Sequence, residues 1–317
     1  MKILITGVAG FIGFNLANHL LLKNYQVIGL DNFDNYYSVK YKKERVRNLK
    51  KFKKFKFIFV NLKDRKKVFK AFSKNKIDLV INLAAQAGVR NSFVDPKKYI
   101  DCNISSFLNI IFASKKFNIK KIIYASSSSV YGDAKKFPLN EKINFKQKNI
   151  YAVTKKLNEQ IAETYSKISK INFIGLRFFT IYGDWGRPDM FLYKMFKSSV
   201  SKKVFKLNNY GNHLRDFTHI EDVNLVFEKL INKKFKNNQI FNICSNDPIN
   251  ILKICNTFKK KHPLKLKFIK KHKADILTTH GDNTKIKKYL KIKEFSNFED
   301  KLQNLFNLYK NKRIYKF

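Results

Sequence analysis

The chain has 317 residues, more than a single hydrophobic core usually serves, so we expect two domains or one large domain with an added lobe. Lysine and arginine outnumber aspartate and glutamate by 66 to 23, giving a formal net charge of +43. The basic residues are nevertheless spread along the chain without a compact nucleic-acid-binding motif, so we favour a solvated surface over a nucleic-acid partner. The three cysteines have no CxxC spacing, so we expect no disulfide framework, which favours the cytoplasm. The six histidines have no HxxxH or HExxH spacing, so we expect no metal site. The chain has no long apolar run, so we expect no membrane span.

Short apolar runs alternate with stretches of helical pattern in the first part of the chain. They are KILITG (2–7), QVIGLDN (26–32), KFIFVN (56–61), IDLVINLAA (77–85), KKIIYASSS (120–128) and INFIGLRFF (171–179). Runs that are apolar on both faces are typical of strands covered by helices on both sides, so we predict an α/β fold with a doubly wound parallel sheet. Later strands (KVFKLN, QIFNIC and KFIKK) are shorter and predict a smaller α/β lobe. We place the domains at 1–178 and 179–317, and the lobe need not be contiguous in sequence.

The first strand is followed by TGVAGFIG, in which Gly7, Gly10 and Gly13 precede the first predicted helix. Glycines at such a turn allow the helix N-terminus to approach a pyrophosphate closely. The spacing is GxxGxxG instead of GxGxxG, but Asp31 ends the second strand, where a carboxylate can hold the ribose hydroxyls of NAD. The same carboxylate would repel the 2′-phosphate of NADP, and no arginine follows until Arg45. We therefore predict a Rossmann-type domain with NAD as its cofactor.

Tyr151 and Lys155 lie four residues apart in a segment of helical pattern, so they share one face of the helix. An ammonium group beside a phenol favours the phenolate and lowers the phenol pKa from about 10, which turns tyrosine into a usable base. A YxxxK pair alone is weak evidence in so lysine-rich a chain. The stretch YASSSSVYG (124–132) adds serine hydroxyls at the carboxyl end of the fifth strand, where open α/β sheets bind ligands.

TGxxGxxG, the strand-end serine and YxxxK together resemble the extended short-chain dehydrogenase/reductase superfamily, within its NAD-dependent epimerase/dehydratase family. The resemblance extends over nearly the whole chain. It is closest to the UDP-glucuronate 4-epimerases in four segments, which are LAAQAGVR (83–90), YASSSSVYG (124–132), GLRFFTIYGDWGRPDM (175–190) and RDFTHIEDV (215–223). The resemblance implies that residues 1–178 bind NAD and that residues 179–317 bind a UDP-sugar.

The resemblance also implies roles for individual residues. Ser127, Tyr151 and Lys155 match the catalytic group, and Lys155 would also hold the nicotinamide ribose. The cofactor positions are Gly7, Gly10, Phe11, Ile12, Gly13, Asp31, Asn32, Leu62, Ala84, Ala85, Gln86, Tyr151 and Lys155. The substrate positions are Ser127, Ser128, Thr180, Arg187, Asn208, Arg215 and Asp275.

Ser128 and Ser129 distinguish this chain from two related groups of enzymes. Sugar-nucleotide 4,6-dehydratases have an Asp–Glu pair at these positions, and UDP-glucuronate decarboxylases have a Glu at the second. Both positions are serine here, which disfavours elimination of water and leaves reversible oxidation at C4. In the implied mechanism Tyr151 takes the C4 hydroxyl proton, NAD takes the C4 hydride, the 4-keto sugar turns over, and the hydride returns to its other face.

Several alternatives remain open at this stage. Arg187 matches a position that faces the substrate carboxylate, but it can instead pair with Asp184 or Asp189 in its own loop. The nearest rival enzyme is a 4-epimerase of neutral or N-acetylated UDP-hexoses, and a non-catalytic NAD-binding sensor is less favoured. The resemblance further implies a homodimer packed through helices near 100–116 and 151–167, and a role in polysaccharide biosynthesis.

Overall fold

The computed structural model describes residues 1–144, 146–271 and 276–311. Within these residues, seven parallel strands form a central sheet. In spatial order they are β10 (Asn238–Ile243), β6 (Asn172–Phe178), β5 (Lys121–Ser127), β4 (Leu79–Asn82), β1 (Lys2–Thr6), β2 (Gln26–Asp31) and β3 (Phe55–Phe59). The doubly wound sheet predicted from the apolar runs is therefore confirmed.

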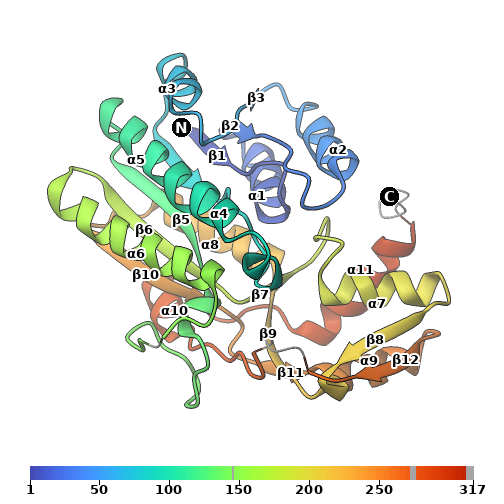
Figure 1. Ribbon diagram of the computed structural model, residues 1–317. Helices are drawn as coiled ribbons and strands as arrows, with labels where there is room; N and C mark the ends of the chain where they lie inside the picture. Colours follow the sequence, from blue (N-terminus) through green and yellow to red (C-terminus); the bar gives the residue numbers. More distant parts are fainter. Residues whose placement is uncertain (145, 272–275, 312–317) are drawn as a thin grey trace.

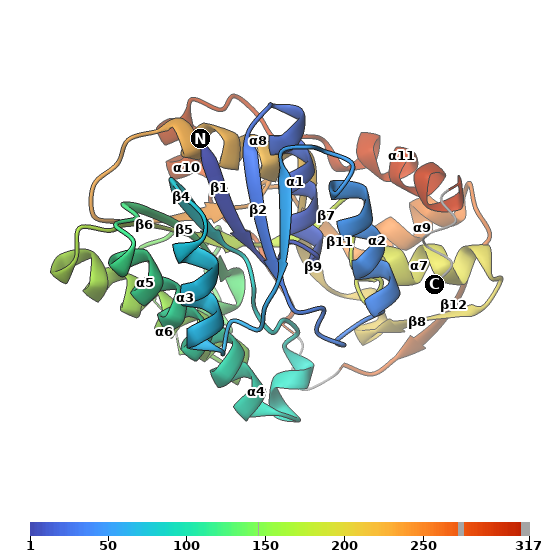
Figure 2. The ribbon, with the colours of Figure 1, turned by 90° about the horizontal axis from the view of Figure 1, so that it is seen from above.

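Helices cover both faces of this sheet, as Figures 1 and 2 show. Side chains alternate between faces along a strand, so Ile3 and Ile5 of β1 join one apolar cluster and Leu4 joins the other. One face carries α1 (Phe11–Leu22), α8 (Ile220–Asn232) and α10 (Thr284–Leu290), and the other carries α3 (Arg65–Ser73), α5 (Ser106–Lys116) and α6 (Ile150–Ile168). None of the described helices has the length and apolar composition needed to cross a membrane.

Strand β10 corrects one expectation from the sequence. QIFNIC was assigned to the smaller lobe, but β10 pairs in parallel with β6 and extends the central sheet. Phe241 and Ile243 are buried in the same apolar cluster as β1 and α1, so the central sheet is where this strand can bury its side chains. Helix α8 also packs against α1, so the central sheet and its covering helices are built from segments on both sides of residue 178.

The smaller lobe lies at the lower right of Figure 1. It contains a three-stranded sheet of β11 (Pro248–Asn250), β9 (Leu214–His219) and β7 (Thr180–Tyr182), and a parallel pair of β8 (Val204–Asn208) and β12 (Lys265–Ile269). Its helices are α7 (Phe191–Val200), α9 (Ile251–Lys259) and α11 (Phe298–Asn311). Phe196, Phe258 and Phe306 meet in its core with ring centroids 4.8–5.7 Å apart.

Helix α2 (Val39–Leu49) connects the glycine turn after β1 to the loop that contains Trp185. Its buried Arg45 donates to the carbonyl of Ala9 at 2.8 Å and to the carbonyl of Trp185. Tyr41 stacks on the Trp185 indole with 5.5 Å between ring centroids. The short elements α4 (Pro96–Ile100), η1 (Arg90–Phe93), η2 (Asp101–Ser105), η3 (Ser128–Tyr131) and η4 (Asn209–Gly211) complete the described structure.

Candidate active site

A cavity of about 310 Å³ opens at the carboxyl edge of the central sheet. The strand order β3–β2–β1–β4–β5–β6 places it where the chain reverses its winding direction between β1 and β4, the usual ligand site of such sheets. Its lining includes every residue predicted to bind the cofactor, among them the catalytic Tyr151 and Lys155, and two further predicted positions, Ser127 and Arg187. These are Gly7, Gly10, Phe11, Ile12, Gly13, Asp31, Asn32, Leu62, Ala84, Ala85, Gln86, Ser127, Tyr151, Lys155 and Arg187.

The glycine turn leaves no room for side chains. A Cβ on Gly13 would lie 2.2 Å from the carbonyl oxygen of Gly7, and one on Gly10 would lie 2.9 Å from the same atom. Gly7 itself has a φ of +69°, which glycine adopts without strain. Helix α1 begins directly after this turn without a side-chain cap, so its first N–H groups are available to an anion. The turn therefore fits the pyrophosphate of a dinucleotide.

Asp31 is held by the backbone at the far end of this turn. Its carboxylate accepts hydrogen bonds from the N–H of Ala9 at 2.9 Å and of Phe33 at 2.8 Å. Burial raises the pKa of the Asp31 carboxyl, and these hydrogen bonds together with the charges of Lys42 and Arg45 offset part of the effect. Because Arg45 is buried against the Ala9 and Trp185 carbonyls, it is poorly placed to receive a 2′-phosphate.

Tyr151 and Ser127 are brought together across the cavity. Helix α6 is capped by Asn149, whose side chain accepts from the N–H of Ala152 at 2.9 Å, and Tyr151 lies in the first turn of the helix. Burial raises the pKa of the Tyr151 phenol, whereas a hydrogen bond with Ser127 and the charge of Arg187 lower it. The strand-end hydroxyl is thus the group that most strongly opposes the effect of burial.

Lys155 lines the same cavity as Tyr151 and is bonded to strand β5. Its Nζ donates to the carbonyl of Ala125 at 2.9 Å, and burial lowers the Lys155 pKa to about 8. The groups that lower the Tyr151 pKa in this structure are Ser127 and Arg187, and acidification of the phenol by Lys155 stays a prediction. The ammonium is directed to the end of strand β5, where its charge is partly desolvated.

The serines of YASSSSVYG have separate roles. Ser126 is buried and donates to the Glu159 carboxylate at 2.6 Å. Ser127 lines the cavity and accepts from the N–H of Ser129 at 3.2 Å, which shapes the turn into η3. Ser128 begins η3 and is half-buried outside the residues that line the cavity. Ser126 and Ser127 therefore line the cavity, and Ser128 and Ser129 lie in the turn that follows the strand end.

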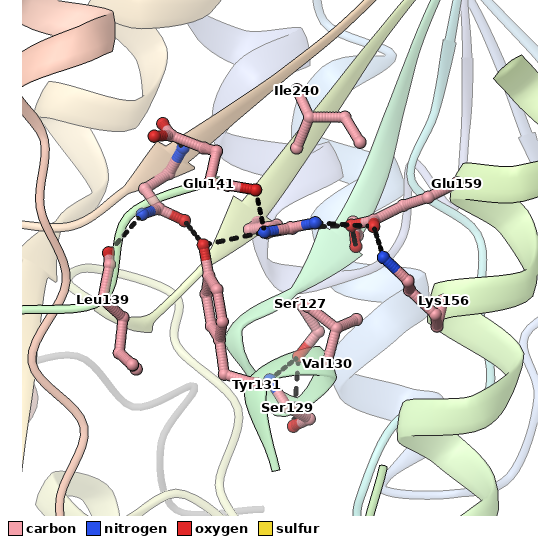
Figure 3. A network of polar contacts seen from close by, with 12 residues as sticks. Ser127, Ser129, Val130, Tyr131, Leu139, Glu141, Lys156, Glu159 and Ile240 are labelled. Carbon is pink, nitrogen blue, oxygen red and sulfur yellow. Dashed lines mark hydrogen bonds and ion pairs between the residues drawn. The ribbon is translucent and has the colours of Figure 1, made fainter. Parts of the chain in front are cut away.

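A buried polar network ties α6 to the sheet. Figure 3 shows Glu141, Tyr131 and Glu159 approaching one another from three parts of the chain. Between them the Arg177 guanidinium donates to both Glu159 oxygens at 2.8 Å and to the Tyr131 hydroxyl at 2.8 Å. Tyr131 in turn donates to Asn242 of β10 at 2.7 Å. Because Arg177 and Glu159 are almost inaccessible to solvent, this ion pair rigidly connects the helix that carries Tyr151 and Lys155 to the sheet.

Arg187 combines the two arrangements considered from the sequence. Its Nε and one Nη donate to the Asp189 carboxylate at 3.0 and 2.6 Å, so the ion pair with a carboxylate of its own loop is formed. The same side chain also lines the cavity and acts electrostatically on Tyr151. The ion pair therefore leaves Arg187 within reach of a ligand.

Thr180, Asn208 and Arg215 are not among the residues that line the cavity. Thr180 begins β7, and Asn208 ends β8. The Arg215 guanidinium donates to the carbonyls of Ile276 at 2.6 Å and Leu277 at 2.9 Å, so it orders the backbone of that segment. Asp275 lies outside the described residues.

Sequence reasoning missed the residues that follow β2. Asp34, Tyr36, Tyr37 and Lys42 line the cavity between the end of β2 and α2. They form no compact motif, and their distance in sequence from residues 125–190 hides their proximity. A pair of adjacent tyrosines after Asp31 was the only available signal.

Gly13→Ala should abolish NAD binding and destabilise the protein by about 1–3 kcal/mol, because the new methyl group overlaps the Gly7 carbonyl. Cofactor content after purification and urea denaturation measure the two effects. Asn18→Ala, on the same helix, is the control and should retain NAD. Full cofactor content in Gly13→Ala would contradict the proposed pyrophosphate site.

Glu159→Gln should lower the free energy of unfolding by about 3–5 kcal/mol, because it leaves the Arg177 charge buried without its carboxylate. Glu163→Gln removes a carboxylate from an exposed pair with Lys167 on the same helix and should cost less than about 1 kcal/mol. Urea denaturation compares the two variants. Equal losses would show that the buried ion pair is not a major anchor of α6.

Comparisons with known proteins identify the family of the chain. The model of the NAD dependent epimerase/dehydratase family matches residues 3–244. Protein CapI of Staphylococcus aureus is 41% identical, over 82% of this chain and 83% of its own. A UDP-glucuronate 4-epimerase of Thermodesulfobacterium geofontis is 34% identical, over 96% of this chain and 94% of its own. The crystal structure of UDP-glucuronic acid 4-epimerase from Bacillus cereus, in complex with UDP-glucuronic acid and NAD, superposes with a TM-score of 0.90 at 30% identity, over 98% of this chain and 99% of its own. The chain therefore belongs to the NAD dependent epimerase/dehydratase family.

Proposed function

We propose that the chain catalyses NAD-dependent epimerisation at C4 of a UDP-hexuronate and interconverts UDP-glucuronate and UDP-galacturonate. The observation that carries this proposal is the single cavity in which the glycine turn, Asp31, the Tyr151–Ser127 pair and Arg187 meet. The first two features suit a dinucleotide, the pair suits proton transfer, and the arginine suits a carboxylate. The relatives that act on UDP-glucuronate support the same conclusion.

Each catalytic residue has a defined task in this reaction. Tyr151 removes the proton of the C4 hydroxyl and later returns it, and Ser127 shares that proton through its hydrogen bond with the phenol. Lys155 has its ammonium near the strand end and holds the ribose next to the nicotinamide. When NAD is bound it accepts hydride from C4 and gives it back to the opposite face, so no external reductant is consumed.

The surroundings of Ser127 favour epimerisation over elimination. Ser128 and Ser129 offer hydroxyls where a dehydratase or decarboxylase carries a carboxylate, so the site has no acid or base at these positions for C5 or C6. A 4-keto uronate is a β-keto acid that tends to lose carbon dioxide. Arg187 counters this by holding the carboxylate away from overlap with the ketone, since a guanidinium fork suits carboxylate geometry.

The UDP end of the substrate is assigned to the smaller lobe. Arg215, Asn208 and Asp275 match positions for the diphosphate and ribose, and Ser128 and Thr180 match positions beside the sugar. Arg215 already orders the carbonyls of Ile276 and Leu277, which supports a role in shaping this end. The domain assignment of NAD to residues 1–178 and UDP-sugar to residues 179–317 belongs to the same proposal.

A 4-epimerase of neutral or N-acetylated UDP-hexoses is the second candidate, because it would use the same Tyr151, Lys155 and Ser127. Arg187 separates the two. Arg187 is already paired with Asp189, and only the sugar ring of a uronate would bring it a second carboxylate.

The purified protein should convert UDP-glucuronate to UDP-galacturonate without added reductant, as followed by proton NMR. Tyr151→Phe should lower the rate by about 10²–10⁴-fold because the general base is removed. Arg187→Leu should abolish turnover of the uronate. Conversion of UDP-glucose with no reaction of UDP-glucuronate would favour the neutral-sugar epimerase instead.

The proposed assembly is a homodimer packed through the segments near 100–116, which hold η2 and α5, and near 151–167, which lie in α6. Ile100, Val153 and Leu157 are exposed apolar side chains in these neighbouring segments, as a face covered by a second copy would be. The described cysteines are free thiols, which agrees with the proposed place of the enzyme in the cytoplasm, where its product would supply polysaccharide biosynthesis.

Leu157→Asp should convert the dimer to a monomer, because it places a charge in the apolar contact. Leu308→Asp is a matched control, since Leu308 and Leu157 are exposed to 41% and 39% on different helices. Sedimentation velocity measures the oligomeric state of each variant. A wild-type monomer, or dissociation by both substitutions, would contradict this interface.

A further inference from the structure

The segment from Asn32 to Ser38, called the strap here, runs along the cavity from Asp31 to the N-terminus of α2. It begins directly after the carboxylate assigned to the NAD ribose, and Ser38 ends it by capping α2 through the N–H of Tyr41 at 3.3 Å. Asn32, Asp34, Tyr36 and other strap residues line the cavity. The strap thus connects the cofactor end of the cavity to the residues that contact Tyr36.

Contacts on both sides give the strap a defined conformation. Asp34 pairs with Lys98 at 2.9 Å, and its carboxylate also accepts from the N–H of Tyr36 at 2.9 Å. Gly88 lies so close to Tyr36 that a Cβ there would be 2.3 Å from the phenol oxygen. Tyr36 is therefore enclosed between the segment after β4 and the loop that carries Arg187.

Tyr36 and Asp189 together enclose the Arg187 guanidinium. The Arg187 Cζ lies 5.5 Å from the centroid of the Tyr36 ring, and the Tyr36 hydroxyl donates to Asp189 at 3.4 Å. Asp189 occupies the Nε edge of the guanidinium through two hydrogen bonds. The second Nη group forms no hydrogen bond with any residue that the structure describes, and the side chain lines the cavity.

We propose that Tyr36 is a positioning residue for Arg187 and thereby determines the preference for a substrate carboxylate. This inference rests on the proposed function, in which Arg187 receives that carboxylate. Asp189 holds one edge of the guanidinium, and the Tyr36 ring restricts its plane, so the remaining Nη is directed to the ligand with little loss of side-chain freedom on binding. Because the strap begins directly after Asp31 and contains Tyr36, one segment connects the cofactor site to the carboxylate site.

The test is a double-mutant cycle read out by binding. NAD-loaded proteins in a Tyr151→Phe background, which prevents turnover, are titrated calorimetrically with UDP-glucuronate and with UDP-glucose, which lacks the carboxylate. The dissociation constant for UDP-glucose divided by that for UDP-glucuronate measures recognition of the carboxylate. Tyr36→Leu, Arg187→Leu and the double variant are compared, with Tyr25→Leu as a control because Tyr25 contacts Asn232 far from the cavity.

Tyr36→Leu should lower this ratio about three- to tenfold by weakening UDP-glucuronate binding alone, and it should have no further effect once Arg187 is leucine. Tyr36→Phe keeps the ring and should retain most of the ratio, and Tyr25→Leu should leave it unchanged. Equal weakening of both ligands by Tyr36→Leu, or an unchanged ratio, would overturn the inference. A ratio near one already in the parent protein would instead contradict the proposed uronate substrate, so the two failures are distinguishable.

Discussion

The buried ion pair between Glu159 and Arg177 is the contact on which the geometry of the site depends. It lies two turns along α6 from Tyr151 and one turn from Lys155, and Ser126 donates to the same carboxylate from the residue next to Ser127. An ion pair of this kind gains its energy only when both charges are fully hydrogen-bonded, and here both Glu159 oxygens are satisfied. The helix and the strand end are consequently fixed at a separation that allows the Tyr151–Ser127 hydrogen bond.

The same network reaches the smaller lobe. Asn242 accepts from Tyr131 and donates to the carbonyls of Leu139 and Asp282 at 2.7 and 3.1 Å. Leu139 is bonded through its N–H to the carbonyl of His280 at 2.8 Å, in the segment that Arg215 orders nearby. The elements proposed to bind NAD and the UDP end of the substrate are therefore parts of one hydrogen-bonded framework.

Burial sets the electrostatics of the cavity. It raises the pKa of Tyr151 and lowers that of Lys155, so each group is shifted towards its neutral form. Arg187 keeps its charge because Asp189 balances it, and it is one of the two groups that favour the Tyr151 phenolate. The residue proposed to hold the substrate carboxylate thus also supports the base, which links recognition of the uronate to proton transfer.

The features that depend on local pattern could be predicted from the amino-acid sequence. Apolar runs predicted the strands, the glycines and Asp31 predicted the dinucleotide turn, and helical spacing placed Tyr151 and Lys155 on one face, because each of these follows from residues close together in the chain. Family resemblance singled out Ser127 and Arg187. Other features depend on contacts between segments that are distant in the chain. β10 joined the central sheet because its apolar side chains could be buried there, and Lys155 turned to the Ala125 carbonyl. Tyr36 came to lie against Asp189 although 153 residues separate them. Contacts over such separations depend on how complete layers pack, and no local pattern of residues encodes that packing.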